Sequence, residues 1–158
     1  MISEKDLEFL KRCVDLAETA VNKGDAPFGS ILVSKEGEVL FEDHNRISGG
    51  DSTQHPEFAI ARWSTEHLSP EDRAEATVYT SGEHCPMCAA AHAWVGLGRI
   101  VYASSSEQLQ AWQKELGIDP SPVMSLSVEE VIRDAVVDGP APELAERIKS
   151  LHARILDR

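Results

Sequence analysis

Two cysteines three residues apart, Cys85 and Cys88, stand where the chain changes from a strand pattern to a helix pattern. The apolar run 76–81 predicts a strand, and 85–95 predicts a helix that begins at the cysteines. Residues three apart share a face of a helix, so both thiols point the same way from its first turn. The free N–H groups and the dipole at this end favour thiolates, and Pro86 suits a first turn. The pattern predicts half of a metal site.

The other half is predicted at His55 and Glu57, which open a second helix. A catalytic zinc site has three protein ligands and one open position, and His55, Cys85 and Cys88 supply three. Two helices on one face of a sheet bring their N-termini together, which would join the two halves. Glu57 precedes the regular part of its helix and can therefore face the same metal. The sequence predicts a zinc ion beside a carboxylate.

Other uses of the two cysteines stay open at this point. A structural zinc site would need a fourth ligand, which His84 or His92 could provide, but Glu57 would then have no role. The cysteines could also be buried without a metal. A redox Cys-x-x-Cys is expected beside a thioredoxin-like unit and without the His-x-Glu motif.

The order of the predicted elements is α-β-β-α-β-α-β-α-β-α, which indicates one α/β domain over 1–158 with helices packed on a mixed sheet. Helices are expected at 3–23, 55–67, 85–95, 107–116, after a cap at Ser127, and at 143–155. Strands are expected at 29–34, 38–45, 76–81, 99–103 and 123–126, a loop at 47–54, and a loop or short cap at 69–72. For the terminal helix, about 141–156, a solvent-facing position is favoured over one that covers the site.

The amino-acid composition limits the kinds of molecule that this chain is expected to bind and where it is expected to act. The net charge is −12, from 15 basic and 27 acidic residues without a basic cluster, so binding to nucleic acid is disfavoured. No apolar run reaches the roughly 18 residues of a membrane span, and the acidic N-terminus lacks a signal core, so a cytoplasmic location is expected. Three cysteines favour metal or catalytic use over a disulfide framework.

Together with 26–30 and Asn45, the motifs at 55–57 and 79–88 resemble those of the cytidine deaminase-like superfamily, in particular its guanine deaminase and tRNA adenosine deaminase branch. The resemblance covers roughly residues 3–118. The sequence departs from the family where relatives usually have Ala in place of Pro56 and Pro in place of His84. The resemblance implies a three-layer fold, with a mixed five-stranded sheet and helices on both faces.

The resemblance also implies the chemistry, which is hydrolytic removal of an amino group from a heterocycle. His55, Cys85 and Cys88 would hold zinc, and Glu57 would move protons as the catalytic residue. The residues implied to bind the base are Asn45, Phe28 and Trp94. Without the resemblance, Trp94 would be assigned to the core. Family members are commonly homodimers through the cysteine helix, which implies the same here.

The expected substrate is a small molecule, a free aminated base such as guanine or a related purine, with cytosine-like or triazine rings next. The alternatives are a tRNA adenosine or nucleoside deaminase, and a zinc-stabilised binding module without turnover. The sequence does not identify the ring.

Overall fold

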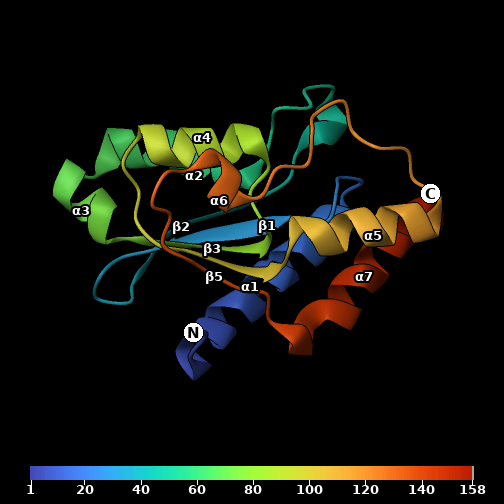
Figure 1. Ribbon diagram of the computed structural model, residues 1–158, viewed down its shortest axis with the longest axis horizontal. Coiled ribbons are helices and arrows are strands. Elements are labelled where there is room, and N and C mark those ends of the chain that lie inside the picture. The colour runs from blue at the N-terminus through green and yellow to red at the C-terminus, as the bar shows by residue number, and fades with distance from the viewer. Residues whose placement is uncertain (158) are drawn as a thin grey trace.

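A five-stranded sheet in the order β2-β1-β3-β4-β5 forms the middle layer of the computed structural model, which describes residues 1–157 (Figure 1). The strands are β1 (Gly29–Val33), β2 (Val39–His44), β3 (Thr77–Gly82), β4 (Ile100–Ser104) and β5 (Val137–Asp138). β1 pairs antiparallel with β2 and β3, whereas β3 with β4 and β4 with β5 pair parallel. The predicted mixed sheet of five strands is confirmed.

Helices cover both faces of this sheet (Figure 1). One layer contains α1 (Glu4–Asn22), α5 (Ser106–Leu116) and α7 (Ala145–Arg154); the other contains α2 (Pro56–His67), α3 (Pro70–Glu75), α4 (Pro86–Trp94) and α6 (Val128–Val131). Short 3-10 turns cover Ile47–Gly49, Pro142–Leu144 and Ile155–Asp157. The three-layer α/β/α architecture agrees with the expectation.

Side-chain alternation along β1 divides the core in two. Ile31 and Val33 pack with α1 and α7, whereas Leu32, between them, packs with Ile60 of α2 on the other face. Successive strand residues point to opposite faces, so an unbroken apolar strand supplies both cores. This arrangement places the N-termini of α2 and α4 on the same face of the sheet, as the metal-site prediction requires.

Two predicted segments differ from the structure. Residues 123–126 are not a strand; the fifth strand is Val137–Asp138, which occupies the edge beside β4. Val123 and Leu126 favour a strand locally, but prolines precede them and the sheet edge is taken by β5. Residues 69–72, expected as a loop or a short cap, form the cap and first turn of α3: the Ser69 side chain caps a helix that continues to Glu75.

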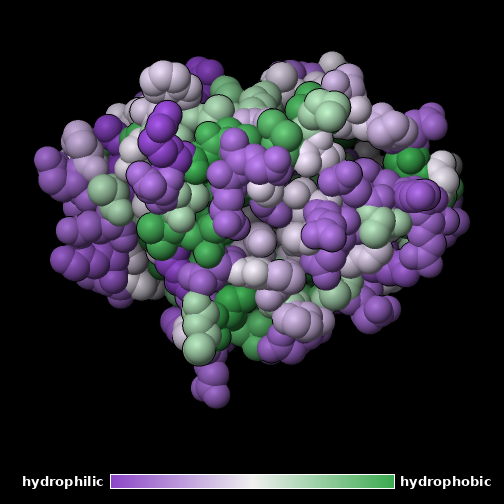
Figure 2. Space-filling view, in the orientation of Figure 1, coloured by the Kyte–Doolittle hydropathy of each residue, from purple (hydrophilic) through white to green (hydrophobic). Residues whose placement is uncertain are grey.

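Hydrophilic side chains cover most of the face shown in Figure 2, and smaller hydrophobic areas interrupt them. Over residues 1–157, no helix is both long and apolar enough to cross a membrane.

Candidate active site

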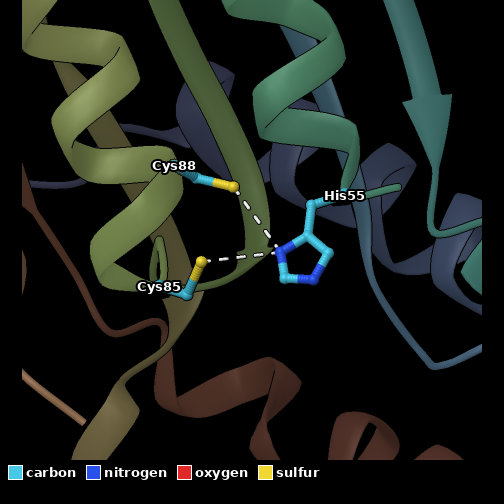
Figure 3. A group of neighbouring side chains, drawn as sticks. All are labelled: His55, Cys85 and Cys88. Atoms are coloured by element: carbon cyan, nitrogen blue, oxygen red, sulfur yellow. Dashed lines mark hydrogen bonds between the residues drawn. The ribbon is translucent and has the colours of Figure 1, made fainter. Parts of the chain in front are cut away.

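The three predicted zinc ligands meet at the starts of α2 and α4. His55 is the N-cap of α2 and Cys85 is the N-cap of α4, while Cys88 lies one turn further along α4. His55 Nδ1 lies 3.5 Å from Cys85 Sγ and 3.6 Å from Cys88 Sγ (Figure 3). All the donor atoms lie within 4.8 Å of one another. The two halves predicted from distant motifs therefore form one cluster.

The spacing of these donor atoms fits a zinc ion. Zinc binds imidazole nitrogen at about 2.0 Å and thiolate sulfur at about 2.3 Å in tetrahedral geometry, which places the two donor atoms roughly 3.5 Å apart. The two measured nitrogen–sulfur distances, 3.5 and 3.6 Å, match that separation. A nitrogen and two sulfurs are also the donor set that zinc prefers. The cluster supplies three ligands, which leaves one coordination position for a small molecule.

The two thiols differ in how readily they lose a proton. Hydrogen bonds from Cys88 and from His55, together with the charge of His55, outweigh burial and lower the pKa of the Cys85 thiol to about 4. Its hydrogen bond to Cys85, followed by burial, raises the pKa of the Cys88 thiol in return. A divalent cation between the two sulfurs would remove this conflict, because it stabilises both thiolates at once.

Glu57 lies beside the cluster in a buried position. Its side chain is 6% exposed, and its carboxylate lies within hydrogen-bonding reach of the Cys88 thiol. Burial raises the pKa of Glu57, and a hydrogen bond from Ser30 opposes part of that rise. A buried carboxylate with a raised pKa accepts and returns protons more readily than an exposed one.

Two hydroxyl groups hold one oxygen of this carboxylate. Ser30 Oγ lies 2.6 Å from Glu57 Oε1, and Thr80 Oγ1 lies 3.0 Å from the same oxygen. The two hydroxyls lie 2.8 Å apart, and Thr80 also reaches the carbonyl oxygen of Gly82 at 2.9 Å. Ser30 and Thr80 are fully buried. Since both hydroxyls converge on Oε1, Oε2 is the oxygen left for proton transfer.

A cavity of about 220 Å³ opens in front of this cluster. Its lining residues come from the chain just before β1 and just after β2, the start of α2, the loop between β3 and α4 with the start of α4, α5, and the segment before α6. They are Phe28, Asn45, His55, Pro56, Glu57, Glu83, His84, Cys85, Pro86, Ser106, Leu109, Gln113, Ser121, Val123, Met124, Ser125 and Leu126. The charged side chains among them are Glu57 and Glu83, and neither Lys nor Arg contributes. Such a cavity suits a small, flat and uncharged ring.

Asn45 is buried at the edge of the cavity and is oriented by the backbone. Its Oδ1 accepts hydrogen bonds from Ala26 N at 3.2 Å and from Ile47 N at 3.1 Å. With both lone pairs of Oδ1 used in this way, the side chain has only its NH2 group to offer a ligand. The group that Asn45 can present to the cavity is therefore a hydrogen-bond donor.

The two predicted aromatic contacts lie in different places. Phe28 lines the cavity and lies against Gly82, where an added Cβ would approach its ring to 3.1 Å. Trp94 does not line the cavity: it lies at the C-terminal end of α4, and its side chain is 88% exposed. The expectation that Trp94 walls the base is not met within this chain, because α4 runs away from the site after Cys88.

Sequence reasoning missed several residues of this site. Ser30 and Thr80 lie in predicted strands, where a small polar residue is not by itself a sign of function. Their role becomes visible only in the sheet, because the pairing of β1 with β3 sets Ser30 opposite Thr80. Residues 123–126, which line the cavity, are predicted as a strand instead. The available signal there was the pair of prolines, Pro120 and Pro122.

The predicted terminal helix does not cover the site. The cavity-lining residues do not include any residue of α7, which packs against α1. The solvent-facing position is also wrong for Leu151 and His152, which are buried.

Comparison with known proteins gives a family match over residues 3–104, to the cytidine and deoxycytidylate deaminase zinc-binding region. A probable cytosine deaminase of Schizosaccharomyces pombe is 36% identical over 108 residues, which are 68% of this chain and 65% of that protein. A tRNA-specific adenosine deaminase of Agrobacterium fabrum is 32% identical over 97 residues, 61% of this chain and 63% of that protein. The chain thus spans less than two thirds of the length of these curated relatives.

A solved structure, the guanine deaminase from Bacillus subtilis, has the same arrangement of elements. It superposes with a TM-score of 0.58 at 26% sequence identity, over 89% of this chain and 90% of that one.

Proposed function

The chain belongs to the family of the cytidine and deoxycytidylate deaminase zinc-binding region, a family of zinc-dependent deaminases, and we propose that its substrate is a free aminated nucleobase such as guanine or cytosine. The reaction replaces the amino group of the ring with the oxygen of water and releases ammonia. The observation that carries the proposal is the lining of the cavity: among the described residues 1–157, no Lys or Arg side chain lines it to hold a phosphate. Nucleotides and tRNA therefore fit it less well than free bases.

Each residue of the site has a defined task in this proposal. His55, Cys85 and Cys88 hold zinc, which when bound lowers the pKa of a water molecule to near neutral and polarises the site. Glu57 Oε2 would accept one proton of the attacking water and pass it to a ring nitrogen next to the amino group, while the water oxygen bonds to the ring carbon. Glu57 would then pass the second proton of the same oxygen to the leaving amine, so that the ring keeps a carbonyl oxygen and ammonia departs.

The remaining contacts orient the ring. The NH2 group of Asn45 donates to an acceptor on the ring, and Phe28 lies against one face of it. Guanine and cytosine both carry a carbonyl oxygen that meets this requirement.

A substrate panel tests the proposal. Purified protein with measured zinc content is incubated with guanine, cytosine, adenine, an aminotriazine and the corresponding nucleosides, and ammonia release is followed. We expect turnover of a free base at least tenfold above that of its nucleoside. Turnover of nucleosides only, or of tRNA only, would contradict the free-base assignment and leave the deaminase chemistry in place.

The role of Glu57 is tested by Glu57→Gln, with Glu66→Gln, an exposed position on the same helix, as the matched control. Glu57→Gln should keep about one zinc per chain and lose roughly 10²- to 10⁴-fold in turnover. The control, Glu66→Gln, should keep the zinc content and the turnover of the wild type. If Glu57→Gln retained more than about a tenth of the turnover, the assigned role would be wrong.

We further propose that the protein is a homodimer through α4. The outward side of this helix carries Met87, Ala90 and Trp94, at the i, i+3 and i+7 spacing of one face, with the exposed Ala93 beside them. An exposed tryptophan beside small residues suits close packing against a second, identical helix.

A further inference from the structure

The carboxylate of Glu83, in the loop between β3 and α4, accepts hydrogen bonds from the first residues of α5 and α6 beside the cavity. Its Oε1 accepts hydrogen bonds from Ser106 N at 2.9 Å and from Ser106 Oγ at 3.2 Å, and its Oε2 accepts one from Val128 N at 2.8 Å. Ser106 is the first residue of α5 and Val128 is the first residue of α6. The backbone of Glu83 is fixed in turn by its own N–H, which donates to Ser104 O at 2.8 Å. Both carboxylate oxygens are thus occupied by helix N-termini, where negative charge is favoured.

The segment between these two helices, residues 117–127, is a wall of the cavity and arches away from the helix layers (orange in Figure 1). Val123, Met124 and Leu126 line the cavity although they are 50%, 77% and 38% exposed. Behind the segment a second hollow of about 400 Å³ separates it from α5. The wall is therefore thin and has open space on both sides.

Few hydrogen bonds hold this wall along its length. Within the described chain, the bonds of 119–126 are local, such as Leu126 N to Met124 O at 2.9 Å and Ser121 Oγ to Val123 O at 2.9 Å. Ile118 N donates to Gln113 O at the α5 end. The wall follows the C-terminal end of α5 and leads into the start of α6. Glu83 holds the α6 end directly through Val128, and it holds α5 at Ser106, the opposite end of that helix from the wall.

We propose that Glu83 is a positioning residue that sets the wall 117–127 against the metal-ligand loop and thereby determines how tightly the ring is held. The inference rests on the proposed function, because the ring is the molecule that the wall would cover. Glu83 does not touch the reacting atoms, so its loss raises KM while the chemical step is preserved. The apolar side chains Val123, Met124 and Leu126 would close on the ring face that Phe28 leaves free.

Val128→Pro tests the contact without altering Glu83 or the zinc ligands. Proline removes the N–H that donates to Glu83 Oε2, and it suits the first position of a helix. Ser127, with φ −70° and ψ 160°, already has the extended backbone that precedes proline. Val128→Ala is the matched control, because it removes the buried side chain and keeps the N–H. Glu83→Gln is an independent variant, since an amide NH2 in place of Oε2 would face the Val128 N–H as donor to donor.

For Val128→Pro and Glu83→Gln we expect KM for the best base of the panel to rise about tenfold, the effect of one charge-assisted hydrogen bond, with kcat within about twofold and zinc content unchanged. Amide hydrogen exchange of 118–127 should accelerate about tenfold in both variants and not in Val128→Ala. Unchanged KM and unchanged exchange in both variants would overturn the proposal. A loss of both zinc content and kcat in these variants would also overturn it, because it would show that Glu83 only stabilises the loop that carries the metal ligands. The exchange and zinc measurements need no substrate, so they test Glu83 even if the panel shows that the proposed function is wrong.

Discussion

At the scale of single residues, the motifs locate the metal ligands well because each motif is local. In His-x-Glu and in Cys-x-x-Cys, the relative positions of the side chains are set within one helix turn. The sheet then brings these two helix turns together. Ser30 and Thr80 could not be found in this way. They lie on two different strands, and both contact Glu57 on a helix, so the contact depends on the tertiary fold. Trp94 lies outside the cavity of its own chain, because the direction of α4 decides what its side chain touches.

The Ser30 hydroxyl provides a residue-scale prediction. Ser30→Ala removes the shorter of the two contacts to Glu57 Oε1, and the loosened carboxylate should lower kcat about tenfold while KM and zinc content stay near those of the wild type. Ser64→Ala is the control: this serine is equally buried, but its hydroxyl bonds only to Ala61 O within α2. Steady-state kinetics with the best base measure both variants. A kcat for Ser30→Ala within twofold of wild type would refute the positioning role.

At the scale of elements, periodicity predicted the helices and the first four strands to within a few residues, because caps and breakers mark their ends. Ser3 with Asp6 at the start of α1 and Gly117 at the end of α5 are examples. The segment 117–127 was not predictable in this way. Its α6 end is held by the contact of Val128 N with Glu83, two residues that are 45 apart in the sequence, and this contact exists only in the folded molecule.

The packing of α7 leads to an element-scale prediction. His152 on this helix is 4% exposed, with its ring centroid 5.4 Å from that of Phe28 and 6.1 Å from that of Trp112. Burial lowers the pKa of His152 to about 4, from an ordinary value of 6.5. The unfolded chain takes up a proton below pH 6.5 and the folded chain does so only near pH 4, so this residue lowers the free energy of unfolding as the pH falls through that window.

At pH 5 the contribution of His152 amounts to about 2 kcal/mol relative to pH 7. His152→Gln and His152→Phe cannot titrate, so both should lose that part of the pH dependence whatever their packing does to stability at pH 7. Urea unfolding at the two pH values measures it, with equal zinc in all samples. A pH dependence equal to that of wild type in both variants would show that His152 is protonated equally in the folded and unfolded chains.

At the scale of the whole molecule, the proposed dimer leads to a prediction about the molecular mass of the protein in solution. Trp94→Asp places a charge on the exposed face of α4 and should convert the dimer to a monomer, as measured by light scattering after gel filtration. Val136→Asp is the control, because Val136 is also an exposed apolar side chain, 64% exposed, but lies outside α4. A monomeric wild type, or a dimer that survives Trp94→Asp, would remove α4 from the interface.

The charge of the whole molecule bears on the alternative of a tRNA substrate. The net charge is −12, and cationic side chains such as Arg12, Arg147 and Arg154 are paired with acidic neighbours. Binding to RNA draws its affinity from phosphate contacts with free Lys and Arg, and it strengthens steeply when salt is lowered.

We therefore expect a tRNA anticodon stem-loop to bind more weakly than about 10 µM at roughly 150 mM salt, in the range of non-specific binding. Fluorescence anisotropy, repeated at lower salt, measures both the affinity and its salt dependence, with a single-stranded DNA of equal length as the comparison. Submicromolar binding of the stem-loop but not of the DNA would require a cationic surface assembled from more than one chain, and it would place the tRNA reaction ahead of the free base.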